Sequence, residues 1–223
     1  MSAVAPVGIL GGSFDPVHHA HLAVARTAQA ALGLARILWI PGGTPPHRAA
    51  PLASAAQRQA MLERALAGEP RWIVDTHELH KTTPCYTVET LAALRADPRR
   101  GLGAATPLVL LIGADQFAHL SAWHRWKDLL ALAHLAVFTR PGWAVAEVAD
   151  AAVRAEFAAR RDAPDGAWRA RAAGAIVPVD MAPLDISSTA IRTRIAAGDT
   201  PRGLLPDAVL DYIAREGLYA KGN

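Results

Sequence analysis

Short apolar segments that alternate with helical segments constrain the fold of this chain more than any other feature. Such segments are typical of strands that lie in a parallel sheet and are buried on both faces. Helices then have to cover both sides of the sheet. The predicted strands span residues 7–10, 36–40, 72–75, 108–112, 134–138 and 176–179, and the predicted helices span residues 18–32, 55–67, 87–95, 189–196 and 207–216. The sequence therefore predicts an α/β fold with a doubly covered parallel sheet.

The length of the chain bounds its domain organisation. A chain of 223 residues fits one domain with insertions, although two small domains also remain possible. Residues 144–175 are rich in Ala, Arg and Asp, which indicates a surface helix with a turn at residues 164–166 rather than an interdomain linker. We expect one domain over residues 1–223, with a C-terminal helical subregion at about residues 186–219.

Composition and charge exclude several classes of protein. Hydrophobic residues make up 52% of the chain and charged residues 19%, which argues against a disordered chain. No apolar run reaches the roughly 18 residues of a membrane span, and residues 1–7 lack the pattern of a secretory signal. Cys85 is the single cysteine, so an intramolecular disulfide and a cysteine metal cage are excluded. With a net charge of +3 and no run of like charges, we expect a cytoplasmic protein without a nucleic-acid or membrane partner.

The segment after the first predicted strand, GGSFDPVHHAHL at residues 11–22, has the features of an anion site. Gly11 and Gly12 permit a close approach of the backbone to a ligand. Asp15 is a favoured helix cap and Pro16 is tolerated in the first turn, so together they indicate a helix start, where free N–H groups favour an anion. His18 and His21 share one face of the first turn and can donate to phosphate oxygens. The alternative is a capped helix with solvent-exposed histidines.

Other phosphate-binding and metal-binding patterns are absent from the sequence. Neither Gly-Lys-Ser/Thr nor Gly-x-Gly-x-x-Gly follows the first strand, which argues against a Walker loop and a hydride-transfer cofactor. His77 and His80 are three residues apart rather than four, so they do not form the zinc-protease motif. We assign no metal site to the chain.

A second candidate anion site precedes the predicted helix at residues 189–196. Ser187, Ser188 and Thr189 supply hydroxyl groups at the start of this helix, where they can cap it or face a phosphate. Arg192 lies one turn into the helix and can reach the same anion. The alternative is an ordinary capped helix with a surface arginine.

These two segments resemble the two motifs of the nucleotidyltransferase superfamily that carries the HxGH signature. Residues 11–22 are similar to its Gly-x-Phe-Asp-Pro-x-His-x-x-His string, with Ala20 where that family usually has glycine. Residues 186–192 are similar to its Ile-Ser-Ser-Thr-x-Ile-Arg motif. The resemblance implies a Rossmann-like, doubly wound parallel sheet with helices on both faces and a C-terminal helical segment.

The middle of the chain resembles one branch of the superfamily, the bacterial nicotinate-nucleotide adenylyltransferases. Residues 40–48, IPGGTPPHR, are similar to the Ile-Pro-x-x-x-Pro-Pro-His-(Lys/Arg) stretch of that family. Gly42 and Gly43 stand where the family is often Asn-rich, so a side-chain contact made there would be lost. Further similar segments are residues 57–62, 85–87, 112–115, 140–142 and 205–219, and the likeness is weakest at residues 143–175.

The resemblance implies an enzyme of NAD biosynthesis that converts ATP and nicotinate mononucleotide into deamido-NAD and pyrophosphate. Its nucleophile is a phosphate oxygen, already anionic near neutral pH, so no strong general base is needed. Catalysis then depends on positioning and on charge stabilisation at the α-phosphorus. We expect Mg²⁺ to arrive with ATP, because no carboxylate cluster indicates a metal cage.

The resemblance also implies the roles of individual residues. The expected catalytic residues are His18, His21 and Arg192. The expected ATP-binding residues are Gly11, Gly12, Ser13, Phe14, Gly113, Asp115, Ser187, Ser188 and Thr189. The expected residues for nicotinate mononucleotide are His47, Arg48, Tyr86, Thr87 and Trp123.

Several alternatives stay open at this point. Asp115 can instead cap a helix, Trp123 can be plain core, and His47 and Arg48 can be exposed loop residues. Phosphopantetheine adenylyltransferases and cytidylyltransferases share the two end motifs, and a nucleotide-sensing protein without turnover is a third possibility. The preference for the nicotinate acid over the amide rests on the resemblance alone. The oligomeric state is not readable, and neither is the closure of a lid at residues 42–46.

Overall fold

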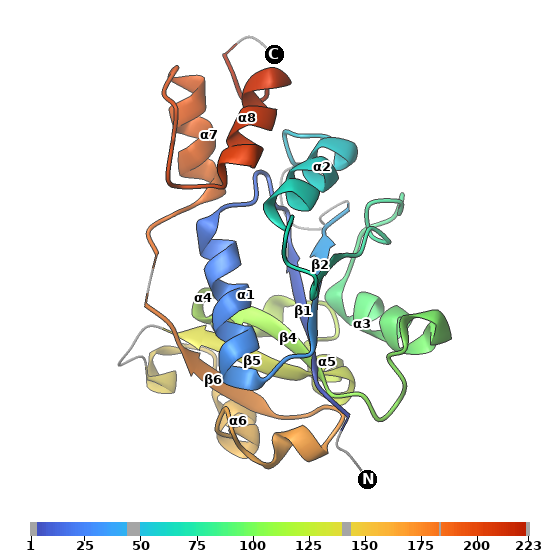
Figure 1. The fold of residues 1–223 in the computed structure, drawn as a ribbon. Coiled ribbons are helices and arrows are strands. Elements are labelled where there is room, and N and C mark those ends of the chain that lie inside the picture. Colours follow the sequence, from blue (N-terminus) through green and yellow to red (C-terminus); the bar gives the residue numbers. More distant parts are fainter. Residues whose placement is uncertain (1–3, 44–49, 140–143, 183, 222–223) are drawn as a thin grey trace.

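The centre of the molecule is a six-stranded parallel sheet with the strand order β3-β2-β1-β4-β5-β6 (Figure 1). The structure is a computed structural model, which describes residues 4–43, 50–139, 144–182 and 184–221. The strands are β1 (Val7–Gly12), β2 (Arg36–Pro41), β3 (Trp72–Val74), β4 (Leu108–Gly113), β5 (His134–Thr139) and β6 (Ile176–Asp180). All six predicted strands are present, and the Rossmann-like fold class is confirmed.

The strand order reverses between β1 and β4. From β1 the chain builds the sheet outward through β2 to β3, then returns to place β4 on the other side of β1 and continues through β5 to β6. In an open parallel sheet, the carboxyl ends of the two strands at such a reversal flank a crevice in which ligands bind. The segments after β1 and β4 are therefore the first places to look for a site.

Eight α-helices in the described residues surround the sheet. They are α1 (His19–Leu32), α2 (Ala55–Ala65), α3 (Thr87–Ala96), α4 (Ala114–Ala118), α5 (Trp126–Leu132), α6 (Ala151–Arg160), α7 (Ser188–Ala196) and α8 (Asp207–Arg215). The five predicted helices are present, with α2 two residues shorter than expected. Residues 144–175 contain the expected surface helix and turn: α6 is mostly exposed and buries Val153 and Phe157 in the core beneath it.

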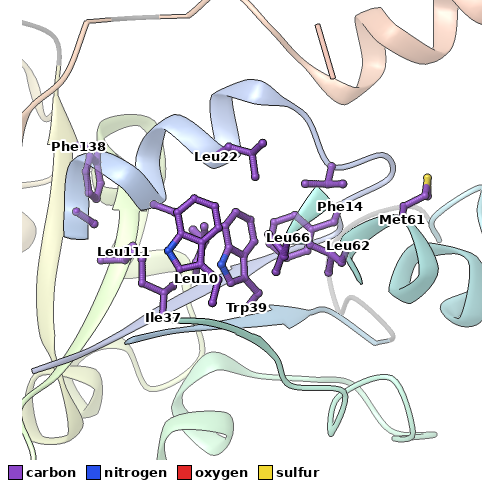
Figure 2. Packing of buried hydrophobic residues seen from close by; sticks show 14 of the residues in the cluster. Leu10, Phe14, Leu22, Ile37, Trp39, Met61, Leu62, Leu66, Leu111 and Phe138 are labelled. Carbon is purple, nitrogen blue, oxygen red and sulfur yellow. The ribbon is translucent and has the colours of Figure 1, made fainter. Parts of the chain in front are cut away.

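Each face of the sheet has its own hydrophobic core, and neighbouring strand residues contribute to opposite cores. On β4, Leu110 and Ile112 belong to the core beneath α3, α4, α5 and α6, whereas Val109 and Leu111 belong to the core beneath α1, α2, α7 and α8. Figure 2 shows part of the second of these cores, in which Trp39 and Leu10 lie beneath α1. Burial on both faces explains why the strands carry no polar alternation.

One arginine connects the end of α3 to three other parts of the chain. The Arg95 guanidinium donates four hydrogen bonds of 2.7–3.3 Å to backbone carbonyls. Its acceptors are the carbonyl oxygens of Leu132, Gly103, Thr106 and Ala172. Arg95 therefore holds together the end of α5 and the segments that lead into β4 and β6.

Candidate active site

The segment that joins β1 to α1, residues 13–18, is the centre of the candidate site and is called the β1–α1 loop below. Phe14 adopts a left-handed conformation with φ of 48°, which is uncommon outside glycine. Its ring is buried in the core near Trp39 (Figure 2), with ring centroids 5.5 Å apart. The centroid of the His21 ring lies 5.0 Å from that of Phe14. Phe14 therefore anchors the loop, and only its backbone can face a ligand.

The N-cap of α1 differs from the sequence prediction, although the helix itself begins within one residue of the expected position. The helix begins at His19 with His18 as its N-cap, three residues after the expected cap Asp15. The Asp15 carboxylate instead accepts backbone N–H groups from Leu52 and Ala53, at 2.8 and 3.1 Å. The prediction of Asp15 as a cap was wrong, because its partners lie on a distant segment.

His18 and His21 come together as their spacing predicted. Their rings stack with centroids 3.8 Å apart, and the His18 backbone N–H donates to Nδ1 of His21 at 3.2 Å. Because Nδ1 of His21 accepts this bond, the proton of the neutral ring lies on Nε2. His21 therefore presents an N–H donor at the first turn of α1.

Both histidine rings are neutral near pH 7. Burial, together with the neighbouring His19, lowers the pKa of His18 to about 4. Burial, together with His18, lowers the pKa of His21 to about 3. Nδ1 of His18 is buried and has no hydrogen-bond partner among the described residues. The pair thus provides uncharged hydrogen-bonding groups at the start of a helix, whose dipole favours an anion.

The second motif lies directly against the β1–α1 loop. Ser187 caps α7 by accepting the Ala190 N–H at 3.1 Å. The Ser188 hydroxyl donates to the Pro16 carbonyl at 2.9 Å, and Nη1 of Arg192 donates to the Asp15 carbonyl at 2.7 Å. Nη2 of Arg192 also lies 3.4 Å from the Thr189 hydroxyl. The two ends of the chain therefore meet at one place, where Figure 1 shows α7 and α8 next to the end of β1.

Two residues that the sequence analysis did not assign to the site also hold the β1–α1 loop. Arg58 is buried, and its Nη1 donates to the Ser13 carbonyl at 2.9 Å and the Gly42 carbonyl at 2.7 Å. Tyr219 donates its hydroxyl to Oδ1 of Asp15 at 2.6 Å. Local spacing carries no signal for these contacts, since they join segments far apart in the sequence.

The end of β4 lies beside β1 in the sheet and carries the predicted Gly113 and Asp115. Gly113 is the N-cap of α4, and its N–H is bonded to Oε1 of Gln116 at 3.2 Å. Asp115 is exposed in the first turn of α4, one residue after the helix begins. Both residues thus lie at the carboxyl end of a strand that flanks the crevice.

A separate group contains the residues expected to bind the mononucleotide. Tyr86 is the N-cap of α3, and Thr87 is the first residue of this helix. The Tyr86 ring lies 4.4 Å from the His124 ring, centroid to centroid, and the partly buried Trp123 packs against the core beneath α3. His47 and Arg48 lie outside the described residues.

The described residues offer neither a metal site built from several side chains nor a membrane-spanning helix. Within residues 4–43, 50–139, 144–182 and 184–221, no three His, Cys, Asp or Glu side chains group so that they could hold a metal ion. In the same part of the chain, no helix combines the length and the apolar character needed to cross a membrane.

Comparison with known proteins gives consistent matches over nearly the whole chain. A family model described as cytidylyltransferase-like matches residues 9–194. A probable nicotinate-nucleotide adenylyltransferase of Dechloromonas aromatica is 47% identical over 216 residues, covering 96% of this chain and 97% of the relative. A protein with the same name from Laribacter hongkongensis is 48% identical over 213 residues, covering 96% and 94%.

A solved structure shows the same fold at low sequence identity. The Plasmodium falciparum nicotinic acid mononucleotide adenylyltransferase complexed with NaAD superposes with a TM-score of 0.67 at 15% identity. The superposition covers 96% of this chain and 97% of that chain.

Proposed function

This chain belongs to the nicotinate-nucleotide adenylyltransferases, and from that premise we propose how its residues transfer the adenylyl group of ATP to nicotinate mononucleotide. A phosphate oxygen of the mononucleotide attacks the α-phosphorus of ATP, and the bond from that phosphorus to the oxygen bridging to the β-phosphate breaks. The products are deamido-NAD and pyrophosphate. The chain is thus a nucleotidyltransferase of NAD biosynthesis.

One observation carries the assignment of the catalytic residues. Arg192 and Ser188, from the C-terminal motif, are hydrogen bonded to the backbone of the loop that ends at His18. This contact gathers a cation, a helix start and two imidazole rings at the carboxyl end of β1. Such groups stabilise negative charge where it develops on phosphate oxygens.

The roles of the catalytic residues follow from their protonation states. The attacking phosphate is already an anion, so the protein does not need to remove a proton from it. His18 and His21 donate hydrogen bonds from neutral rings, and Arg192 supplies the positive charge. We assign these groups to the α- and β-phosphates and to the departing pyrophosphate. The remaining ATP-binding residues at this end of the site are Gly11, Gly12, Ser13, Phe14, Ser187, Ser188 and Thr189.

The other two subsites follow from the family resemblance and from position. Gly113 and Asp115 at the end of β4 are assigned to the adenosine of ATP, with Asp115 on a ribose hydroxyl. Tyr86 and Thr87 are assigned to the nicotinate carboxylate, which their backbone groups at the start of α3 can bind. Trp123 is assigned to the pyridine ring by stacking. His47 and Arg48 are assigned to the same mononucleotide.

The divalent metal belongs to the substrate in this proposal. Mg²⁺ enters bound to the phosphates of ATP and neutralises part of their charge.

We further propose that residues 1–223 form one nucleotidyltransferase domain with a C-terminal helical subregion at about residues 186–219, and that the protein acts in the cytoplasm without a nucleic-acid or membrane partner.

Pyrophosphate release tests the substrate assignment. The protein is incubated with ATP and Mg²⁺ and with nicotinate mononucleotide, nicotinamide mononucleotide or phosphopantetheine. We expect strong preference for the nicotinate acid. Turnover with phosphopantetheine alone would contradict the assignment of the mononucleotide subsite, and ATP binding without turnover on any acceptor would favour a nucleotide sensor.

The same assay tests the role of the histidine pair. His18→Ala is expected to lower kcat about 100-fold, the scale of losing one donor to a developing charge. His19→Ala is the matched control, because it removes a neighbouring ring that has no assigned role. Turnover of His18→Ala within about twofold of the wild type would exclude the catalytic role of His18.

A further inference from the structure

We propose that Tyr219 is a positioning residue of the reaction: its hydroxyl fixes the Asp15 carboxylate, and Asp15 fixes the β1–α1 loop and Arg192. The inference rests on the proposed function, because the groups that Asp15 positions are those assigned to the phosphates of ATP. It gives a role in the reaction to the C-terminal segment after α8.

The Asp15 carboxylate is a fixed point rather than a reacting group. It is 3% exposed, and both of its oxygens accept hydrogen bonds. Oδ1 accepts from the Tyr219 hydroxyl at 2.6 Å and the Ala53 N–H at 3.1 Å, and Oδ2 accepts from the Leu52 N–H at 2.8 Å. A carboxylate is an acceptor on both oxygens, and here each already has a donor. Asp15 is therefore placed to hold backbone segments together.

Asp15 lies where three segments of the site meet. Its backbone carbonyl accepts the 2.7 Å hydrogen bond from Arg192, whose Nη1 is also 3.9 Å from Oδ2. Its carboxylate holds Leu52 and Ala53, which follow the segment that carries His47 and Arg48. A shift of Asp15 thus moves the loop that ends at His18, the guanidinium of Arg192 and the segment leading into α2 together.

Tyr219 is held in place to donate to Asp15. It follows the last turn of α8 in a left-handed conformation, with φ of 66°, which is rare for a residue with a side chain. Its partly buried ring packs against the core beneath α1, α2, α7 and α8, and its hydroxyl also lies 3.9 Å from the Met61 sulfur. Burial and the adjacent Asp15 raise the pKa of Tyr219 far above its ordinary value. The hydroxyl therefore stays protonated and remains a donor.

The C-terminal segment contacts the start of α1 and the β1–α1 loop at further points, so the Tyr219 contact is part of a larger interface between them. Ser188 donates to the Pro16 carbonyl at 2.9 Å, and the Leu204 carbonyl accepts the His19 N–H at 3.0 Å. With these bonds fixing the backbone, the hydroxyl of Tyr219 is the one side-chain donor, beside the Leu52 and Ala53 N–H groups, that orients the Asp15 carboxylate in the bonds described. A displacement of about 1 Å at a reacting centre can change the rate about 100-fold.

Tyr219→Phe removes the hydroxyl and keeps the ring. We expect kcat for adenylyl transfer, per folded protein, to fall about tenfold. We expect the KM values for ATP and nicotinate mononucleotide to stay within about twofold, because the base and the pyridine ring bind elsewhere. A purely structural role would instead lower the melting temperature and leave kcat per folded protein unchanged. Circular dichroism gives the folded fraction.

Two controls separate positioning from packing. Tyr212→Phe makes the same chemical change in α8, where the Tyr212 ring lies 4.3 Å from the Arg64 guanidinium. It is expected to leave kcat and KM unchanged. Ile213→Val removes one buried methylene group from the same helix. This variant is also expected to keep the wild-type kcat per folded protein.

A double-mutant cycle shows whether the hydroxyl acts through Asp15. In Asp15→Asn, the amide N–H₂ replaces a carboxylate oxygen and faces one of the groups that now donate to that oxygen. We therefore expect a lower kcat for Asp15→Asn than for Tyr219→Phe. If Tyr219 acts through Asp15, the double variant is no slower than Asp15→Asn alone. Multiplicative losses in the double variant, or a wild-type kcat for Tyr219→Phe, would overturn the proposal. Absence of turnover in the wild type would refute the proposed function and this inference with it.

Discussion

The neutral histidine pair predicts that the protein loses stability in mild acid. The pKa values of His18 and His21 are about 4 and about 3 in the folded protein, whereas an unfolded histidine titrates near 6.5. Below pH 6.5 the unfolded chain therefore binds protons that the folded protein does not. Stability rises with pH wherever the unfolded state binds more protons, so the contribution is complete above pH 6.5 and is lost as the pH falls.

The size of this loss at pH 5 follows from the unfolded state. At pH 5 the folded rings are still neutral. Protonation of each histidine in the unfolded chain stabilises the unfolded state by about 2 kcal/mol relative to pH 7. His18 and His21 together are expected to lower the free energy of unfolding by about 4 kcal/mol between pH 7 and pH 5. This loss in the free energy of unfolding hardly depends on the exact pKa values of the folded rings, as long as these lie below 5.

Urea unfolding of the wild type and of His18→Asn at pH 7 and pH 5 measures how much of this loss in free energy of unfolding comes from His18. Asparagine is also a good N-cap and does not titrate, so the variant is expected to lose about 2 kcal/mol less than the wild type on going to pH 5. Burial also lowers the pKa of His77 and His134, but these contribute equally to both proteins. A phosphate-free buffer is required, because a bound anion favours the charged rings. Equal losses in the two proteins would refute the assignment of His18 as neutral.

The remaining two predictions concern packing, and urea unfolding at pH 7 checks both. Arg95→Ala is expected to cost about 3 kcal/mol, because four backbone carbonyls each lose a hydrogen bond, and only those of Gly103 and Ala172 keep a backbone N–H donor among the bonds described. Full stability in Arg95→Lys would show that the planar guanidinium is not needed. Gly8→Ala is expected to cost about 1–3 kcal/mol, because its Cβ would lie 2.7 Å from a Leu34 methyl. Gly11→Ala on the same strand meets nothing within 4 Å, and a loss as large there would contradict the steric argument.

The sequence was sufficient to predict the sheet and most of the helices. Strands buried on both faces appear as apolar runs, so β1 to β6 were all located before the structure. The helices α4 and α5 were missed, because they have five and seven residues and are too short to show helical periodicity. The N-cap of α1 is His18 and not Asp15, whose carboxylate is bonded to a distant segment.

The candidate site was predictable where its contacts are local. The spacing of His18 and His21 placed the rings on one face of a turn, and they stack there. Asp15 was misread as a cap, because its donors lie 37, 38 and 204 residues away in the sequence. Arg58 was missed for the same reason, since its two acceptors follow different strands. Residues that hold loops from a distance leave no spacing signal.

The contact between Asp15 and Tyr219 has a consequence for the order in which the protein matures during synthesis. The two residues are 204 positions apart, and a ribosome adds about 5–20 residues per second. About 10–40 s therefore pass between the synthesis of the β1–α1 loop and the synthesis of Tyr219, which holds Asp15 in that loop. For most of that interval the nascent chain carries the two histidines without Arg192, and for all of it without Tyr219. An adenylyltransferase whose first loop depends on α7, α8 and Tyr219 is expected to become active only after these have been synthesised.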